Sequence, residues 1–327
     1  MKLVTYLLDH RVRLGAVIGE DLDVVVDLST AGSHVGRYVP SDILSFLEQG
    51  ERALDAGRET LVRVDTEAPY CFRQSEVRLL SPIPRPPSMR DAYAFRQHVE
   101  TSRRNRGVPM IPEFDQFPVF YFTNHQAVFG PGTVSVLPRH LERLDFELEC
   151  AMVVGKGGKN ISADRADEHV AGLMIMNDLS ARGLQMEEMK LSLGPAKGKD
   201  FATVLGPWLV TVDELEDVRK TGKDGDRYAL GMSSTVNGEQ VSKDNLANIS
   251  WTFAQILERV SYGVQLYPGE VIGSGTCGTG CFLELNGSGI TKNQWLNPGD
   301  RVVLAIDRLG SLETEIVLEQ EVGRGQG

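Results

Sequence analysis

The sequence lacks any run of about 18 consecutive apolar residues, the length that a helix needs to cross a membrane. Its first nine residues, Met1 to Asp9, include charged side chains before the apolar core of a signal peptide could form. These two absences predict a cytoplasmic protein with no membrane partner.

Cysteine and positive charge are both scarce. The four cysteines (Cys71, Cys150, Cys277 and Cys281) match no zinc-site spacing, and we expect free thiols in a reducing cytosol. The 45 acidic residues outnumber the 34 Lys and Arg residues, which gives a net charge of −11. Nucleic acids and anionic membranes require a concentrated basic face, and the densest basic cluster, at 103–106, is too short to supply one. Nucleic acid is therefore not an expected partner.

The composition is that of a globular protein with a large core: 41% of the 327 residues are hydrophobic and 24% are charged. Four prolines between positions 82 and 87 exclude a helix there and indicate an extended domain boundary. We therefore predict a small α+β N-terminal domain (1–81) followed by a larger, β-rich domain (82–327). The expected elements are strands at 2–8, 13–18, 23–27, 133–137, 145–155, 171–178 and 207–212, helices between 41 and 61, and two final strands between 299 and about 322.

An unusual acidic stretch lies in the expected strand at 145–155. Asp145, Glu147 and Glu149 alternate with apolar residues, so a strand would place the three carboxylates on one face. Burying such charges costs several kcal/mol each unless a cation lies between them, and oxygen ligands favour Mg²⁺, Ca²⁺ or Mn²⁺ over zinc. An exposed strand whose acidic face meets water remains the alternative for this stretch alone.

Other segments offer further candidates. A helix predicted from Met89 to about Arg104 would place Asp91 and His98 on one face, although a single histidine is more often a surface or core residue. Asp178 follows a buried strand and is either a ligand or the N-cap of a helix at 179–189. That helix would place Arg182 and Gln185 on one face.

The segment 273–278 matches the G-x-G-x-x-G pattern of dinucleotide-binding loops. Such a loop must open a helix, whereas 281–285 alternates like a strand, which would point Glu284 outward. We therefore reject a dinucleotide site and expect these glycines to present Thr276 to a different site.

Seven blocks of residues, in a fixed order between about 80 and 310, resemble the fumarylacetoacetate hydrolase family. The blocks are Asp91-x-Tyr93-x-x-Arg96-Gln97-His98, Pro118-Val119-x-Tyr121, Arg143-Leu144-Asp145-x-Glu147-Leu148-Glu149, Met176-Asn177-Asp178-x-Ser180-Ala181-Arg182-x-x-Gln185, Gly198-Lys199-x-Phe201-x-Thr203, Pro207-Trp208, and Gly275-Thr276 with Leu283-Glu284. The resemblance implies a β-rich α+β fold in which a mixed β-sandwich roll follows a small N-terminal domain. It also implies a homodimer formed through the C-terminal domain.

The resemblance assigns roles to individual side chains. The metal ligands of the family fall on Asp91, Glu147, Glu149 and Asp178. Asp145 has no ligand counterpart and would support the site from behind. The general base falls on His98, oriented by Glu284. Substrate and charge-stabilising contacts fall on Tyr93, Tyr121, Arg182, Gln185, Lys199 and Thr276, and Arg106 matches a lid arginine but lies one residue closer to the histidine.

The function that this resemblance implies is metal-dependent hydrolysis of a carbon–carbon bond in a β-diketo acid. The expected substrate is fumarylacetoacetate, cleaved to fumarate and acetoacetate in tyrosine and phenylalanine catabolism, with Mg²⁺ or Ca²⁺, or else Mn²⁺, as cofactor. The block Arg96-Gln97-His98 with a late Glu284 favours this type, although the chain is shorter than the animal enzymes. Open alternatives are an acylpyruvate hydrolase, a 2-oxo acid decarboxylase or a hydratase on the same metal site, and a non-catalytic divalent-metal-binding module.

Overall fold

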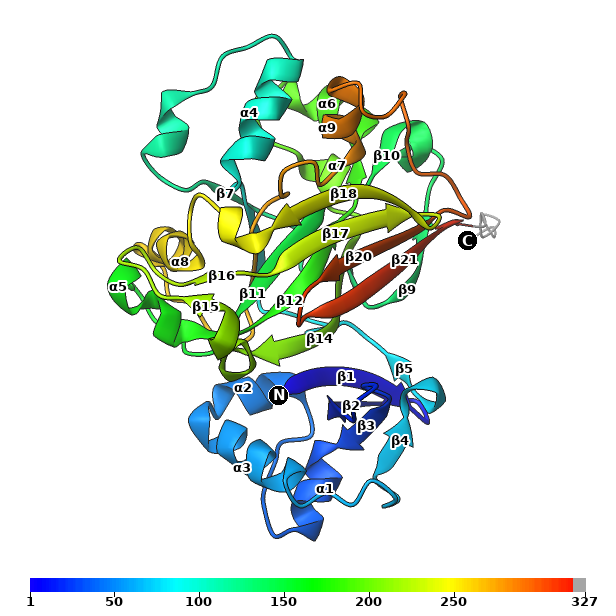
Figure 1. Cartoon of the computed structure of the whole chain (residues 1–327), viewed down its shortest axis with the longest axis vertical. Helices are drawn as coiled ribbons and strands as arrows, with labels where there is room; N and C mark the ends of the chain where they lie inside the picture. The colour runs from blue at the N-terminus through cyan, green and yellow to red at the C-terminus, as the bar shows by residue number, and fades with distance from the viewer. Residues whose placement is uncertain (320–327) are drawn as a thin grey trace, which may run out of the picture.

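The computed structural model describes residues 1–319 and shows a strand-rich α+β fold (Figure 1). A 12-stranded mixed sheet runs through the molecule, and a five-stranded sheet packs against it over one large apolar core. The predicted fold class is confirmed. The two expected C-terminal strands are present as β20 (Arg301–Ile306) and β21 (Gly310–Leu318), while the part of the prediction at 320–322 lies outside the described residues.

The N-terminal segment forms the lower lobe in Figure 1. Its three expected strands are present, and the run expected to form one or two helices between 41 and 61 forms two. An additional helix, α1, begins because Asp27 accepts a hydrogen bond from the Thr30 N–H, at 2.8 Å, and so caps it. The elements are β1 (Lys2–Leu8), β2 (Arg11–Ile18), β3 (Val24–Asp27), α1 (Leu28–His34), α2 (Ile43–Glu48), α3 (Glu51–Leu61), β4 (Cys71–Arg73) and β5 (Arg78–Leu79).

The lower lobe is joined to the rest of the molecule through the large sheet. Strand β1 pairs antiparallel with β14 (Thr203–Thr211), with Lys2 opposite Val210. Leu3 and Phe46 of the lobe also share an apolar cluster with Leu209 of β14. The sheet and the apolar cluster thus cross the predicted division at 81/82, and the two domains remain a prediction.

The upper body is built around the middle of the large sheet. The order there is β14, β12 (Val170–Asp178), β11 (Leu148–Val154), β19 (Val271–Gly273), β6 (Met89–Ala92) and β7 (Phe120–Phe122). Every residue of β11 is buried, as expected for a strand covered on both faces. The five-stranded sheet has the order β18 (Glu239–Asn245), β17 (Gly231–Val236), β20, β21 and β9 (Gly132–Val136), and a short pair joins β10 (Leu144–Asp145) to β13 (Ser180–Ala181).

Helices gather around the upper end of the body in Figure 1. They include α4 (Arg96–Asn105), α6 (Arg182–Met189), α7 (Ala196–Lys199) and α9 (Phe282–Gly287), whereas α5 (Ala163–Ala166) and α8 (Phe253–Ser261) lie to one side. Among the described residues, no helix is both long and apolar enough to cross a membrane.

Three predicted elements are wrong. The expected continuous strand at 145–155 is interrupted at 146–147, because Asp145 ends β10, which pairs with β13, whereas Leu148 begins β11 in the large sheet. The expected helix at 89–104 begins only at Arg96, because Met89–Ala92 pairs in parallel with β19 as strand β6. The expected strand at 281–285 is the helix α9. The reason given above for rejecting a dinucleotide loop therefore fails. The rejection itself stands on topology, because the strand that follows α9, β20, belongs to the other sheet and no βαβ unit forms.

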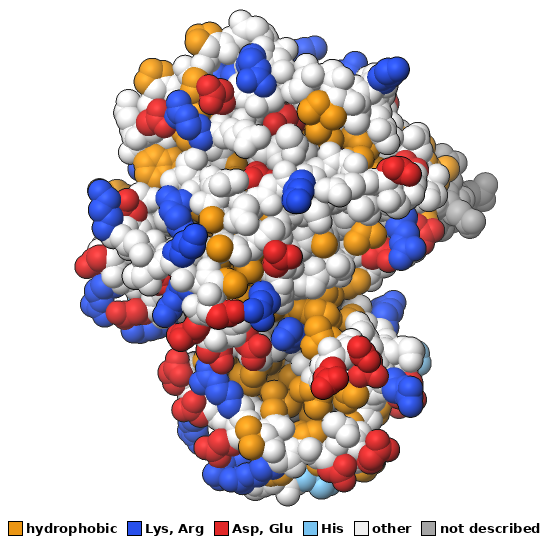
Figure 2. Space-filling view, in the orientation of Figure 1, with side chains coloured by type: hydrophobic (Ala, Val, Ile, Leu, Met, Phe, Trp, Pro, Cys, Tyr) orange, Lys and Arg blue, Asp and Glu red, His pale blue; other side chains and the backbone are white. Residues whose placement is uncertain are grey.

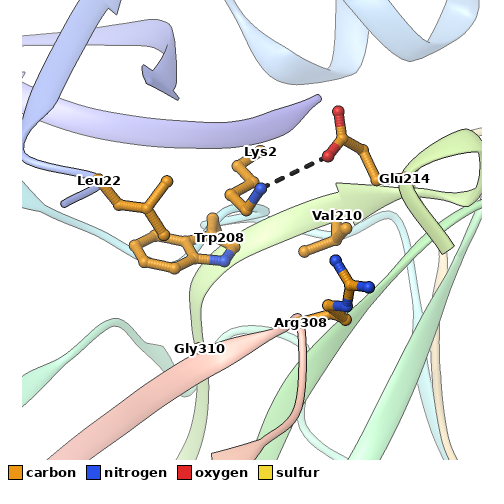
Figure 3. Close-up of a pocket in the computed structure, with 7 residues that line it drawn as sticks. All are labelled: Lys2, Leu22, Trp208, Val210, Glu214, Arg308 and Gly310. Carbon is orange, nitrogen blue, oxygen red and sulfur yellow. Dashed lines mark hydrogen bonds and ion pairs between the residues drawn. The ribbon is translucent and has the colours of Figure 1, made fainter. Parts of the chain in front are cut away.

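A cavity of about 270 Å³ lies where the lower lobe meets the body, beside the apolar groove visible in Figure 2. Lys2 donates a hydrogen bond to Glu214 Oε2 at its rim, at 3.4 Å (Figure 3). The lining residues are Lys2, Leu22, Trp208, Val210, Glu214, Arg308 and Gly310. None of them is a predicted site residue.

Candidate functional site

Four predicted metal ligands come together at the upper end of the large sheet. Asp91, Glu147, Glu149 and Asp178 are all buried and place carboxylate oxygens within 4.8 Å of one another. They come from β6, from the break between β10 and β11, from β11, and from the end of β12. The antiparallel pairing of β11 with β12 explains part of this convergence, because it sets Glu149 opposite Met176, two residues before Asp178.

Two cations lie against these acids. Lys199 Nζ donates to Asp178 Oδ2, at 2.7 Å, and also to Glu147. Arg182 Nη2 donates to Glu147 Oε1 at 2.8 Å, and its Nη1 donates to Gln185 Oε1 at 3.0 Å. The sequence-based expectation assigned these three side chains to the substrate. The structure also makes Lys199 and Arg182 partners of the acidic ligands, and Gln185 contacts Arg182.

Two hydroxyl groups complete the surroundings of the acids. The Tyr121 hydroxyl donates to Asp178 Oδ2 at 2.7 Å, and Thr276 Oγ1 donates to Glu149 Oε1 at 3.3 Å. Gly275, before Thr276, has φ of +78°, and a Cβ there would lie 2.6 Å from the Ala92 carbonyl oxygen. The glycine-rich segment therefore permits a close backbone approach that places Thr276 at the site.

Burial and mutual repulsion set the charge of the cluster. Burial, together with the nearby Asp178, raises the pKa of Asp91 to about 7, and burial with the neighbouring acids raises the pKa of Glu149 well above its usual value. Burial would also raise the pKa of Glu147, but Lys199 and Arg182 outweigh it and lower that pKa. The cluster thus holds more acidic groups than its two cations balance.

The donor set fits a divalent cation. Glu149 Oε2 and Asp178 Oδ1 are buried and have no hydrogen-bond partner among the described residues, which is costly for carboxylate oxygens. All four side chains offer oxygen, the donor that hard ions such as Mg²⁺, Ca²⁺ and Mn²⁺ prefer. A cation shared by the four carboxylates would satisfy both oxygens and offset the repulsion.

A second group of residues forms beside the cluster. His98 is buried in α4, and its Nδ1 lies 2.7 Å from Glu284 Oε2 in α9. Tyr93 meets the His98 ring edge to face, with ring centroids 5.7 Å apart, and burial raises the pKa of the tyrosine to about 12. The structure therefore pairs His98 with Glu284 as expected. His98 lies on a helix, as predicted, whereas Glu284 lies on a helix in place of the predicted strand.

Some residues depart from the expected arrangement. Arg106 is exposed at the end of α4, where its Nε donates to the Ser102 carbonyl oxygen at 3.1 Å, and it makes no hydrogen bond to the acidic cluster. Cys281, which sequence reasoning did not select, has its sulfur within 4.8 Å of ligand atoms of His98 and Glu284. Asp145, in agreement with the expectation, is fully buried and is not one of the four clustered carboxylates. The sequence carried a signal for Arg106, its one-residue offset from the family position, whereas nothing in the sequence selected Cys281.

Comparison with known proteins identifies the family. The family of the fumarylacetoacetate (FAA) hydrolase C-terminal domain matches residues 88–317. This range covers most of the chain and all of the predicted site residues. The chain belongs to the fumarylacetoacetate hydrolase family. The recognition made from the seven sequence blocks is therefore confirmed.

Individual members of the family differ in their named activities. A bovine relative, mitochondrial oxaloacetate tautomerase FAHD2A, is 32% identical over 280 residues, which are 85% of this chain and 81% of the relative. Oxaloacetate tautomerase YisK of Bacillus subtilis is 27% identical and covers 97% of this chain and 100% of its own length. Rice fumarylacetoacetase is 32% identical over 62% of this chain and 58% of its own length.

A solved structure supports the fold over the whole chain. The fumarylacetoacetate hydrolase from Exiguobacterium antarcticum aligns with a TM-score of 0.70 and 24% identity, over 98% of this chain and 100% of its own. The relatives are named as a fumarylacetoacetase and as tautomerases, so the family is one of enzymes. Family members bind divalent metals, and the acidic cluster could hold one. Because this bovine relative is mitochondrial, the cytoplasmic location of the chain stays a prediction. The homodimer also stays a prediction.

Proposed function

We propose that this chain is a metal-dependent hydrolase that cleaves a carbon–carbon bond of a β-diketo acid, with fumarylacetoacetate as the first substrate to test. This reaction would place it in tyrosine and phenylalanine catabolism. The observation that supports the proposal is the His98–Glu284 pair, at 2.7 Å, beside the four-carboxylate cluster. Such a site combines a held base with a place for a Lewis acid.

In this proposal Asp91, Glu147, Glu149 and Asp178 hold the cation, which when bound supplies Lewis-acid polarisation of a carbonyl group. Glu284 accepts the Nδ1–H of His98, which leaves Nε2 free to take a proton from water.

The water oxygen then bonds to the attacked carbonyl carbon, and the carbon–carbon bond breaks with its electron pair on the departing carbon. The proton held by His98 passes to that carbon. Lys199 and Arg182 bring positive charge to the place where negative charge develops, and a well-placed donor contributes about 3 kcal/mol. Gln185 orients the arginine through its own hydrogen bond.

A second candidate is keto–enol tautomerisation of oxaloacetate. It is favoured by the relatives, because two tautomerases match over 81% and 100% of their lengths, whereas rice fumarylacetoacetase matches over 58%. The same His98 would remove a proton from carbon and return it to oxygen, without adding water. The two reactions therefore differ in product and share the base.

The test is turnover of the purified protein on fumarylacetoacetate, an acylpyruvate and oxaloacetate, each with Mg²⁺, Mn²⁺ or Ca²⁺. Loss of diketone absorbance reports hydrolysis, decay of enol absorbance reports tautomerisation, and CO₂ release reports decarboxylation. Hydration of an unsaturated 2-oxo acid is followed in the same panel. Rapid enol decay with an unchanged diketone would favour the second candidate, and thermal stabilisation by metal without any turnover would favour a binding module.

His98→Asn tests the base in either reaction. We expect kcat to fall by about 10² to 10⁴ while metal binding is retained, because the amide cannot take the proton. His10→Asn is the control, since His10 is exposed in a turn with φ of +62°, a conformation that asparagine tolerates. A His98→Asn protein that bound metal and kept most of its rate would contradict the assignment.

A further inference from the structure

Asp145 accepts hydrogen bonds from three backbone N–H groups and from Arg182. Its Oδ1 accepts the N–H of Phe282 at 2.7 Å and that of Phe146 at 3.0 Å. Its Oδ2 accepts the N–H of Leu283 at 3.0 Å and Arg182 Nε at 2.9 Å. The side chain has no solvent exposure, so these partners account for its placement.

The two N–H groups from 282 and 283 are the first of helix α9. A helix begins with N–H groups that have no partner inside it, and Cys281 at the N-cap position makes no capping side-chain hydrogen bond. Asp145, which is far away in the sequence, accepts hydrogen bonds from these two N–H groups instead of Cys281. Glu284, which holds His98, follows Leu283 directly, so the position of the base depends on this helix start.

The other partner of Asp145 leads to the metal side of the site. Arg182 contacts Asp145 with Nε and Nη2, and the same Nη2 donates to Glu147 Oε1 at 2.8 Å. Asp145 therefore joins the helix that carries Glu284 to the guanidinium that contacts a predicted metal ligand. No other described carboxylate contacts both sides.

We propose that Asp145 is a positioning residue that fixes Glu284, and through it His98, relative to the metal ligands. The proposal rests on the function proposed above, because it assigns Asp145 to the placement of that base. Asp145 itself touches neither base nor cluster. Its effect should therefore appear in the chemical step more than in metal or substrate binding.

Asp145→Asn tests this role, because the amide has the same shape but offers one oxygen, and its NH₂ group would face N–H donors. We expect kcat to fall about 10- to 100-fold, the size typical of residues that orient a reacting group. KM and the Mn²⁺ dissociation constant should change less than about threefold. Amide hydrogen exchange in the peptide covering 281–287 should become faster, with or without metal.

The matched control is Asp27→Asn. Asp27 is likewise a buried aspartate that pairs with an arginine, Arg13, and accepts a helix N–H, that of Thr30, but it lies in the lower lobe. This variant should lose stability while kcat is unchanged. A general loss of stability would therefore not imitate the expected result.

Two further variants separate positioning from bulk structure. In a Glu284→Gln background, Asp145→Asn should lower kcat by less than about threefold, because both changes act through one residue. Adding Cys281→Ser to Asp145→Asn supplies a local N-cap and should restore part of the exchange protection and of kcat. If Asp145→Asn alone folds poorly, kcat and amide exchange are measured on this double variant instead.

Equal losses of Mn²⁺ affinity and kcat in Asp145→Asn would overturn the proposal, since Asp145 would then act through Glu147. Multiplicative effects of Asp145→Asn and Glu284→Gln on kcat would also overturn it. The same holds if the Asp145→Asn, Cys281→Ser double variant regains neither protection from amide exchange nor kcat. If the wild-type protein turns over none of the three substrates, the proposed function fails. The exchange and Mn²⁺ measurements then still decide whether Asp145 holds α9 independently of the metal ligands.

Discussion

At the scale of single residues, the candidate site is assembled from side chains that lie far apart in the sequence. The family blocks selected the four carboxylates and the His98–Glu284 pair, which the structure brings together. The spacing could not show that Lys199 would lie between Asp178 and Glu147. Such contacts depend on how strands and helices meet, which is a property of the folded chain and not of a local pattern.

Replacing Glu149 tests the cation at this scale. Glu149→Gln removes one of four crowded carboxylates and replaces one of its two oxygens with an NH₂ group, which cannot bind a cation. In a chelator, we expect the variant to unfold at the same temperature as the wild type or a higher one, because repulsion is reduced. The increase in melting temperature on adding Mg²⁺ should be lost, because affinity for the ion falls.

Thermal unfolding in EDTA and in Mg²⁺ measures both effects. Glu187→Gln is the matched control, since Glu187 is exposed on α6 and its one salt-bridge partner within residues 1–319 is Arg139. Its response to Mg²⁺ should equal that of the wild type. A Glu149→Gln protein that Mg²⁺ still stabilises by the full amount would remove Glu149 from the ligand set.

At the scale of elements, prediction succeeded for long buried strands and failed for short segments. Strand β12 was recognisable from an apolar run that ends in Asp178. Strand β6 has only four residues and forms because β19, about 180 positions later, pairs with it. Helix α9 has no cap of its own in the sequence, since its acceptor is Asp145, and six residues are too few for apolar spacing to distinguish helix from strand.

The contact between α6 and α7 supplies a prediction about elements. A Cβ at Gly198 would lie 2.6 Å from Gln185 Cβ and 2.7 Å from the Gln185 backbone nitrogen. Gly198→Ala should therefore push α7 away from α6 and displace Lys199 from Glu147. We expect a loss of about 1 to 3 kcal/mol in the free energy of unfolding, together with a lower kcat.

Urea unfolding and turnover of the same preparations check this expectation. Gly57→Ala is the control, because Gly57 lies in helix α3 and its Cβ would meet side-chain atoms only, the nearest being Met1 Sδ at 3.3 Å. That change should leave kcat unaltered. Wild-type stability and rate in Gly198→Ala would show that α7 can shift without consequence for Lys199.

At the scale of the whole molecule, the prolines at 82–87 suggested a domain boundary, but no pattern in the sequence showed that one sheet is shared across it. The two sides meet at β1 and β14 and in one apolar cluster that includes Leu3 and Phe46 on one side and Met174 and Leu209 on the other. Hydrophobic periodicity shows which residues are buried, but not which residues they are buried against.

This sharing predicts that residues 82–327 do not fold alone. Removing 1–81 would expose the edge of β14 and the apolar surface around Met174 and Leu209 to water. We expect an aggregated product without a cooperative unfolding transition. Gel filtration and thermal unfolding, with the full-length chain purified in parallel as control, provide the measurement. A soluble fragment that unfolds cooperatively would instead establish 81/82 as a true domain boundary.

The pairing of Lys2 with Val210 also has a consequence for synthesis on the ribosome. Strand β1 leaves the exit tunnel about 200 residues before its neighbour β14, which at roughly 5 to 20 residues per second is a delay of about 10 to 40 s. During that time the apolar side of the nascent lower lobe has no partner. Slower translation would prolong this exposure, so the yield of soluble protein should depend on the chaperones available while the chain is being made.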